Sequence, residues 1–115
     1  FPDVSALSQF TLRVRTTQPT FAGFKFGFYP APGGSFSTGY KADFNATTAW
    51  SNVALPFNKF SSATSAATGE PTKTCEKDPT VCPSSETLAG LNELDIWAEG
   101  HAGDVTLDVA WIKAE

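Results

Sequence analysis

The chain has 115 residues, of which 41% are hydrophobic and 17% charged, with a formal net charge of −4 and a pI near 4.8. These values predict one domain, residues 1–115, that buries its own core, and they exclude a disordered chain. No apolar run approaches the roughly 20 residues of a membrane-spanning helix. We therefore expect no transmembrane segment. The eight basic residues are dispersed rather than gathered in one patch, so we expect no nucleic-acid partner either.

The first two predicted strands have one apolar face each. In the first, Phe10, Leu12 and Val14 alternate with Thr11, Arg13 and Arg15. This period of two is typical of a strand with one buried and one wet face. In the second, within residues 21–29, Phe24, Phe26 and Phe28 share one face, and Gly23, Lys25 and Gly27 share the other. Two glycines leave bare backbone, so we expect a bulky group to pack there or the strand to bend.

Residues 39–60 predict a pair of short strands joined by a turn, arranged as a hairpin. The apolar face of the first is Tyr40, Ala42 and Phe44, and Val53 and Leu55 mark the second. Pro56 has no N–H to donate and ends the ladder, after which Phe57 and Phe60 turn inward. Trp50 falls on the face opposite Val53. Its parity places it at a bulge or on the outer surface of the sheet.

Residues 61–86 are rich in Ser, Thr, Ala, Pro and Gly and predict a long surface loop. Cys75 and Cys82 lie inside it, separated by six residues that include Pro79. A disulfide is favoured over a metal site or two free thiols. Such a bond closes a short ring, so we expect it to hold the tip of the loop rather than the core.

Two further strands are predicted at the end of the chain. Leu94, Ile96 and Ala98 alternate with Asp95, Trp97 and Glu99. After a tight connection at residues 100–103, Val105, Leu107 and Val109 alternate with Thr106 and Asp108, and Trp111 and Ile112 make both faces apolar. No segment has a helical period. About six strands with turns between them predict an all-β fold, an antiparallel β-sandwich or jelly roll.

The order of the motifs resembles the complex I intermediate-associated protein 30 family. The motifs are Tyr-Lys-Ala-x-Phe at 40–44, Trp-x-x-Val-x-Leu-Pro-Phe-x-x-Phe at 50–60 and Gly-Asp-x-x-Leu-Asp-x-x-Trp-Ile at 103–112, preceded by the strand at 10–15. This resemblance covers most of the chain outside residues 61–86 and implies a galactose-binding-like β-sandwich.

The chain departs from the family pattern in two places. Members of the family begin with a further pair of strands that carry a Gly-Gly-x-Ser type motif, and nothing like it precedes Phe1. Either those strands lie outside this sequence, or the lineage has lost them. If those strands are missing, we expect an uncovered edge or face of the sandwich that another segment fills. The loop from Cys75 to Cys82 is the second departure, which we interpret as an insertion.

Motifs for catalysis or metal binding are scarce. His101 lies in a Gly-rich connection, where a solvated turn residue is the simpler interpretation. One His and one close Cys pair do not supply the four ligands of a zinc site. Asp95, Glu99 and Asp108 are predicted to share a sheet face, an arrangement that glycosidases use for catalysis. Without a set of partners lining a cleft, a solvated face balanced by Arg13 and Arg15 is the favoured interpretation. Gly33-Gly34 lacks the Lys and helix of a phosphate loop. We therefore expect no enzyme and no cofactor.

Aromatic side chains on outer sheet faces favour a binding role. Trp50 and Trp97 have the outward parity, and Tyr29 and Trp111 are predicted to end strands. The candidate binding residues are Trp50, Trp97, Tyr29, Arg13 and Arg15. The alternative is that Trp50 and Trp97 pack beneath the long loop or the missing strands. Asn45-Ala46-Thr47 is a glycosylation sequon, which matters only in a secreted chain.

Two functions remain open. The resemblance implies a non-catalytic assembly factor or accessory subunit that binds protein subunits of respiratory complex I or a photosystem. The alternative is a carbohydrate-binding module of a secreted protein, because the galactose-binding-like fold hosts many of these. A disulfide would place the chain in an oxidising space, the thylakoid lumen or the mitochondrial intermembrane space, or outside the cell.

Overall fold

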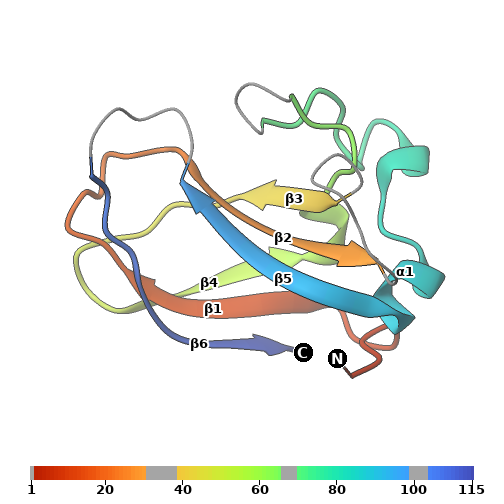
Figure 1. Cartoon of the computed structure of the whole chain (residues 1–115), viewed down its shortest axis with the longest axis horizontal. Helices are drawn as coiled ribbons and strands as arrows, with labels where there is room; N and C mark the ends of the chain where they lie inside the picture. Colours follow the sequence, from red (N-terminus) through yellow and green to blue (C-terminus); the bar gives the residue numbers. More distant parts are fainter. Residues whose placement is uncertain (1, 31–38, 66–69, 99–103) are drawn as a thin grey trace.

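The computed structural model of the protein describes residues 2–30, 39–65, 70–98 and 104–115. In these residues two three-stranded antiparallel sheets pack face to face (Figure 1). Sheet A has the order β4 (Ser51–Pro56), β1 (Gln9–Arg15), β6 (Asp108–Ala114), and sheet B has the order β3 (Tyr40–Asp43), β2 (Phe24–Pro30), β5 (Leu91–Ala98). The predicted antiparallel β-sandwich is confirmed.

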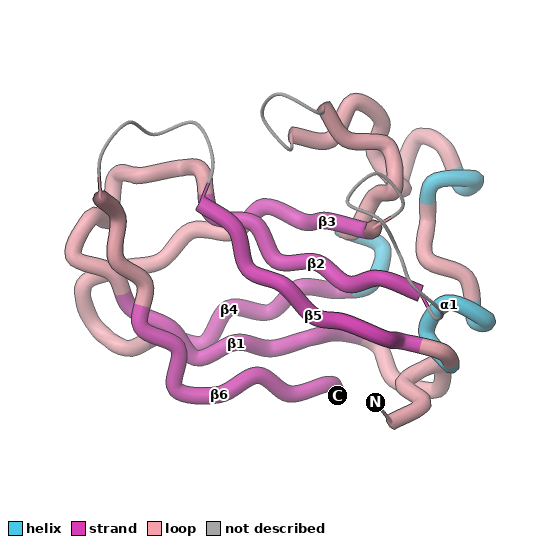
Figure 2. Tube along the Cα trace, in the orientation of Figure 1, coloured by secondary structure: helices cyan, strands magenta, loops and turns pink. Residues whose placement is uncertain are grey.

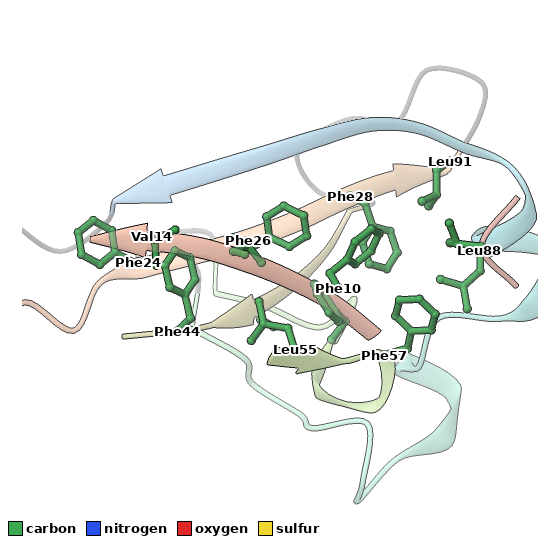
Figure 3. Close-up of a cluster of buried hydrophobic side chains, with 14 of the residues drawn as sticks. Phe10, Val14, Phe24, Phe26, Phe28, Phe44, Leu55, Phe57, Leu88 and Leu91 are labelled. Carbon is green, nitrogen blue, oxygen red and sulfur yellow. The ribbon is translucent and has the colours of Figure 1, made fainter. Parts of the chain in front are cut away.

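Phenylalanine side chains fill the space between the sheets. Phe10 of β1 lies with its ring centroid 5.2 Å from that of Phe26 and 5.4 Å from that of Phe57. Phe24 and Phe44 stack at 5.6 Å farther along the core (Figure 3). The inward faces predicted for the first two strands are confirmed, because their apolar residues are all at most 3% exposed.

The hairpin predicted in residues 39–60 is wrong. β3 pairs with β2 in sheet B, whereas β4 pairs with β1 in sheet A, so the chain crosses from one layer to the other between them. Both segments carry an inward apolar set, and Phe44 and Leu55 are both buried in the core. The apolar faces of β3 and β4 bury more surface when the strands lie in opposite sheets and face each other across the core than when the strands lie side by side in one sheet.

Pro56 ends β4 as predicted. The next three residues form the 3₁₀ helix η2 (Phe57–Lys59), and Phe57 and Phe60 turn inward with 9% and 0% exposure. Residues 61–65 then return to sheet B, because Ser61 and Lys41 exchange two backbone hydrogen bonds of 3.0 Å.

Two helical segments in residues 70–89 were not predicted. A 3₁₀ helix, η3 (Pro79–Val81), is capped by the Asp78 carboxylate, and a helix of five residues, α1 (Ser85–Ala89), is capped by the Ser84 hydroxyl. Figure 2 shows the helical segments at one end of the sandwich. Each is about one turn long, too short for a hydrophobic period to be visible in the sequence.

The last strand begins later than predicted. β6 starts at Asp108, and the backbone of residues 104–106 is bound by side chains instead of a sheet ladder. The Gln18 side chain accepts from the Thr106 amide at 2.8 Å and donates to the Asp104 carbonyl at 2.7 Å. A shift in register leaves Ala110 without a partner on β1. Trp111 lies in the middle of β6 and not at its end.

Candidate functional site

The five candidate binding residues lie on two opposite surfaces of the sandwich. Arg13 and Arg15 point outward from β1, and Trp50 lies beside Arg15 just before β4. These three share the outer face of sheet A. Tyr29 of β2 and Trp97 of β5 lie on the outer face of sheet B. The structure therefore brings three of the five residues together and separates them from the other two.

The outer face of sheet A is built from cross-strand rows. The first row contains Trp50, Arg15 and Asp108, and the second contains Asn52, Arg13 and Trp111. In the third row, Lys113 of β6 lies opposite Thr11 of β1. We call the aromatic and basic members of these rows the sheet A strip: Trp50, Arg15, Arg13, Trp111 and Lys113.

The first row is held by one guanidinium group. Arg15 lies 4.6 Å from the Trp50 ring centroid, and its Nε donates to the Asp108 carboxylate at 2.8 Å. Both charged side chains remain about half exposed, at 47% and 56%. A hollow of about 390 Å³ opens here, lined by Arg15, Thr16, Thr17, Thr48 and Asp108. An aromatic ring, an ion pair and hydroxyls meet at this one place.

The second row places an exposed indole next to an ordered arginine. Arg13 Nη1 donates to the Asn52 side-chain oxygen at 2.9 Å, and Arg13 is paired in register with Trp111. Trp111 is 36% exposed, and the Lys113 ammonium lies 5.2 Å from its ring centroid. The sequence pattern marked Trp111 as an aromatic residue but placed it at a strand end. β6 continues beyond it because Ile112, Lys113 and Ala114 also pair with β1, which the sequence does not display.

Among the described residues, several outward side chains of sheet B are packed against other groups, unlike Arg15 and Trp111 on sheet A. Trp97 lies across Gly27, where an added Cβ would be 2.7 Å from the indole ring and 2.4 Å from the Tyr40 carbonyl oxygen. The expectation that a bulky group packs on the bare glycine backbone is confirmed. The Lys41 ammonium lies 4.5 Å from the Trp97 ring centroid, and Lys41 itself is buried. Trp97 thus packs as part of the fold.

A buried lysine joins the long loop to sheet B. The Lys25 side chain is 0% exposed, and its ammonium lies 2.8 Å from the Glu70 carboxylate and 3.2 Å from that of Asp43. Burial by itself would lower the pKa of Lys25, but the hydrogen bond to Glu70 and the charge of Asp43 raise it above the usual value. Hydrogen bonds from Lys25 and Asp43 lower the pKa of Glu70. Burial, together with the Glu70 hydrogen bond, raises the pKa of Asp43.

The predicted sharing of one face by three carboxylates is wrong. Asp95 lies on the outer face of sheet B and Asp108 on that of sheet A, because β5 and β6 belong to different sheets. Glu99 lies outside the described residues.

Two acidic groups and a tyrosine interact on the outer face of sheet B. A hydrogen bond with Asp95 raises the pKa of Glu93. The pKa of Tyr29 is raised chiefly by burial and then by the charges of Asp95 and Glu93.

The disulfide between Cys75 and Cys82 is present. Within the described ranges, no group of three or more His, Cys, Asp or Glu side chains could hold a metal ion. His101, like Gly33 and Gly34, lies outside those ranges. No helix in the described part of the chain is long and apolar enough to cross a membrane. Asn45 of the sequon is exposed.

No protein-family model, curated protein or solved structure matches the chain. The site is therefore judged on its own geometry. That geometry consists of an exposed strip of two indoles and three basic groups on sheet A, next to a polar hollow.

Proposed function

We propose that the chain is a non-catalytic binding module that engages its partner through the sheet A strip. The observation that supports this proposal is the contrast in exposure between the two outer faces. Arg13, Arg15 and Trp111 are accessible on sheet A, whereas Lys25, Lys41 and Tyr29 are at most 4% exposed on sheet B. Accessible indole and guanidinium groups are the side chains that most often dominate protein interfaces.

A protein partner fits this surface better than other ligands. The strip covers β1, β6 and the residue just before β4, and it offers two aromatic surfaces with cations beside them, which suits an acidic and partly apolar protein surface. The resemblance to the complex I intermediate-associated protein 30 family supports one class of partner. We propose that the module serves as an assembly factor or accessory subunit of a large organellar membrane complex, respiratory complex I or a photosystem.

The disulfide supports an oxidising compartment for this module. Cys75 is 8% exposed and bonded to Cys82, and bonds of this kind persist where thiols are not kept reduced. The thylakoid lumen and the mitochondrial intermembrane space meet this condition. The extracellular space would meet it too, in which case the exposed Asn45 becomes a candidate glycosylation site.

Carbohydrate binding is a second candidate, favoured by the hollow beside Trp50. Sugars are recognised by an aromatic surface together with charged groups that bind neighbouring hydroxyls. Trp50, Arg15 and Asp108 offer this combination, and the hollow of about 390 Å³ lies within the range of small-ligand sites. The Arg15 guanidinium already covers one side of the Trp50 ring, which leaves less of that ring for a sugar.

Affinity capture and a glycan array separate the two candidates. The wild-type chain, an Arg13→Ala/Trp111→Ala variant and a Lys77→Asp control are used to capture proteins from detergent-solubilised organelle membranes. We expect subunits of one membrane complex with the wild type and the control, and a loss with the double variant. Sugar binding on the array that is abolished by Trp50→Ala would overturn the assembly role. Equal capture by the double variant would rule out the strip as the binding surface.

A further inference from the structure

The outer edge of β6 has no partner strand within the described part of the chain. Among the described strands, β6 pairs with β1 on one side only, and it lies at the margin of sheet A (Figure 1). Val109 and Trp111, which are 39% and 36% exposed, both lie on this strand. An edge with free backbone donors and acceptors and exposed apolar side chains is a template for pairing with another strand.

An apolar groove lies beside this edge. It has a volume of about 240 Å³ and lies between β6 and β5, the edge strand of the other sheet. Its lining is almost wholly apolar: Pro2, Val4, Phe10, Leu91, Leu94, Ile112 and Ala114, with Lys113. A strand added to β6 would direct its inner side chains toward this groove, because side chains on neighbouring strands share faces.

The sequence of β6 is complementary to itself when it runs antiparallel. If Ala110 of one copy lies opposite Trp111 of another, Asp108 falls opposite Lys113 at both ends of the pairing. In the same register Val109 falls opposite Ile112. Opposite charges and apolar residues that face each other across strands stabilise a sheet.

The faces of these residues agree with that register. Asp108 and Lys113 pair with Arg15 and Thr11 of β1, so both lie on the outer face. Val109 and Ile112 pair with Val14 and Leu12, so both belong to the inner face. The charged pairs would therefore form on the outside, and Val109 of the second copy would lie beside Ile112 at the groove.

We propose that a second copy of this chain pairs with the β6 edge, antiparallel, with Asp108 opposite Lys113. Two three-stranded A sheets would then form one continuous sheet with a two-fold axis near Ala110 and Trp111. A second copy is the occupant favoured here because β6 matches itself in both charge and face. The dimer would carry two sheet A strips side by side, a property beyond the binding role proposed above.

Association of the purified chain tests the proposal directly. Sedimentation equilibrium is measured from about 1 μM to about 1 mM, the range in which small interfaces associate. We expect the mass to rise from 12.2 kDa toward twice that value. A constant monomer mass over the whole series would overturn the proposal and leave the binding role untouched.

Charge variants test the register. In a homodimer of Asp108→Lys or of Lys113→Asp, like charges lie opposite each other at both ends of the pairing. The dissociation constant of each single variant should therefore rise about tenfold or more. Mixed together, the two variants restore both attractive pairs and should form a heterodimer. Lys77→Asp, which makes the same charge change at another exposed lysine, should dimerise like the wild type.

Thermal melting of each variant confirms that it is folded before its mass is measured. Should Asp108→Lys fail to fold because its ion pair with Arg15 is lost, Val109→Lys takes its place, since an inward charge on an edge strand prevents pairing. A dimer unaffected by Lys113→Asp and Val109→Lys contradicts the register. So does a mixture of two folded single variants that remains monomeric.

Discussion

The outer faces of the two sheets carry similar residues in very different surroundings. Sheet A presents Arg13 and Arg15, and sheet B presents Lys25 and Lys41 at equivalent outward positions. The arginines are partly or largely accessible, whereas both lysines are 0% exposed. Trp111 on sheet A is 36% exposed, whereas Trp97 on sheet B packs onto bare backbone at Gly27. Outward parity in a strand therefore does not imply contact with solvent.

The difference arises from what lies over each sheet. On sheet B, Trp97 covers Gly27, Tyr29 lies against Gly39, and the long loop contributes Glu70 to Lys25. These contacts form a second, mixed layer of aromatic and ionic groups outside the main core. Among the described residues, the first two rows on sheet A are held by side chains of the sheet itself and of Trp50. Arg13, Arg15 and Trp111 therefore stay accessible, whereas Lys25 and Lys41 do not.

The largest expected difference between the faces comes from adding a side chain at a small residue. Gly27→Val places a Cβ 2.4 Å from the Tyr40 carbonyl, which is backbone and moves only with its strand. We expect the free energy of unfolding to fall by about 3 kcal/mol or more. The matched change on the open face, Ala54→Val, should stay within about 0.5 kcal/mol. Urea denaturation measures both, and similar losses would contradict the contrast between the faces.

The next largest difference is expected between two outward-facing tryptophans, Trp97 on sheet B and Trp111 on sheet A. Trp97→Ala removes packing over Gly27 and against Lys41, so we expect a loss of about 2 kcal/mol in unfolding free energy. Trp111→Ala removes a side chain that is already 36% exposed, and we expect less than about 1 kcal/mol. Chemical denaturation gives the values, and near-ultraviolet circular dichroism reports the indole environments. Equal losses would show that Trp111 is as much part of the fold as Trp97.

The smallest effect is a pH dependence that arises from the carboxylates around Lys25 on sheet B. The folded state lowers the pKa of Glu70 below its usual value of 4.5 through the Lys25 hydrogen bond. The stability contributed by Glu70 is therefore present above that value and is lost as pH falls through the lower, folded pKa. The difference in unfolding free energy between wild type and Glu70→Gln should shrink as pH falls from about 7 to about 3.

Asp43 acts in the opposite direction to Glu70. Its pKa is raised, chiefly by burial, so its ionisation weakens the folded state as pH rises. Asp43→Asn should therefore remove the loss of unfolding free energy that ionisation of Asp43 causes as pH rises. Asp108→Asn on the open face serves as the control, because its ion pair with Arg15 is about half exposed. A control variant with the same pH dependence as Glu70→Gln would contradict a sheet B origin.

Much of the fold could be predicted from local patterns. Alternation placed Phe10, Leu12 and Val14 in the core, and the missing N–H of Pro56 ended β4. The close spacing of Cys75 and Cys82 indicated their disulfide. Of the candidate site, Trp50, Arg13 and Arg15 were assigned to an outer sheet face, and they share one. These features depend on neighbouring residues in the chain, which a sequence displays.

The tertiary structure decided which strands pair and which outward side chains are packed beneath other segments. Nothing local tells β3 to join β2 while β4 joins β1, since that choice depends on apolar faces meeting across the core. The shift at Ala110 depends on how β6 fits β1, and the side chain of Gln18 holds residues 104–106 out of the ladder. Alternation along a strand determines only which way a side chain points. Whether it then meets water, as Arg15 does, or Glu70, as Lys25 does, depends on segments that are distant in the sequence.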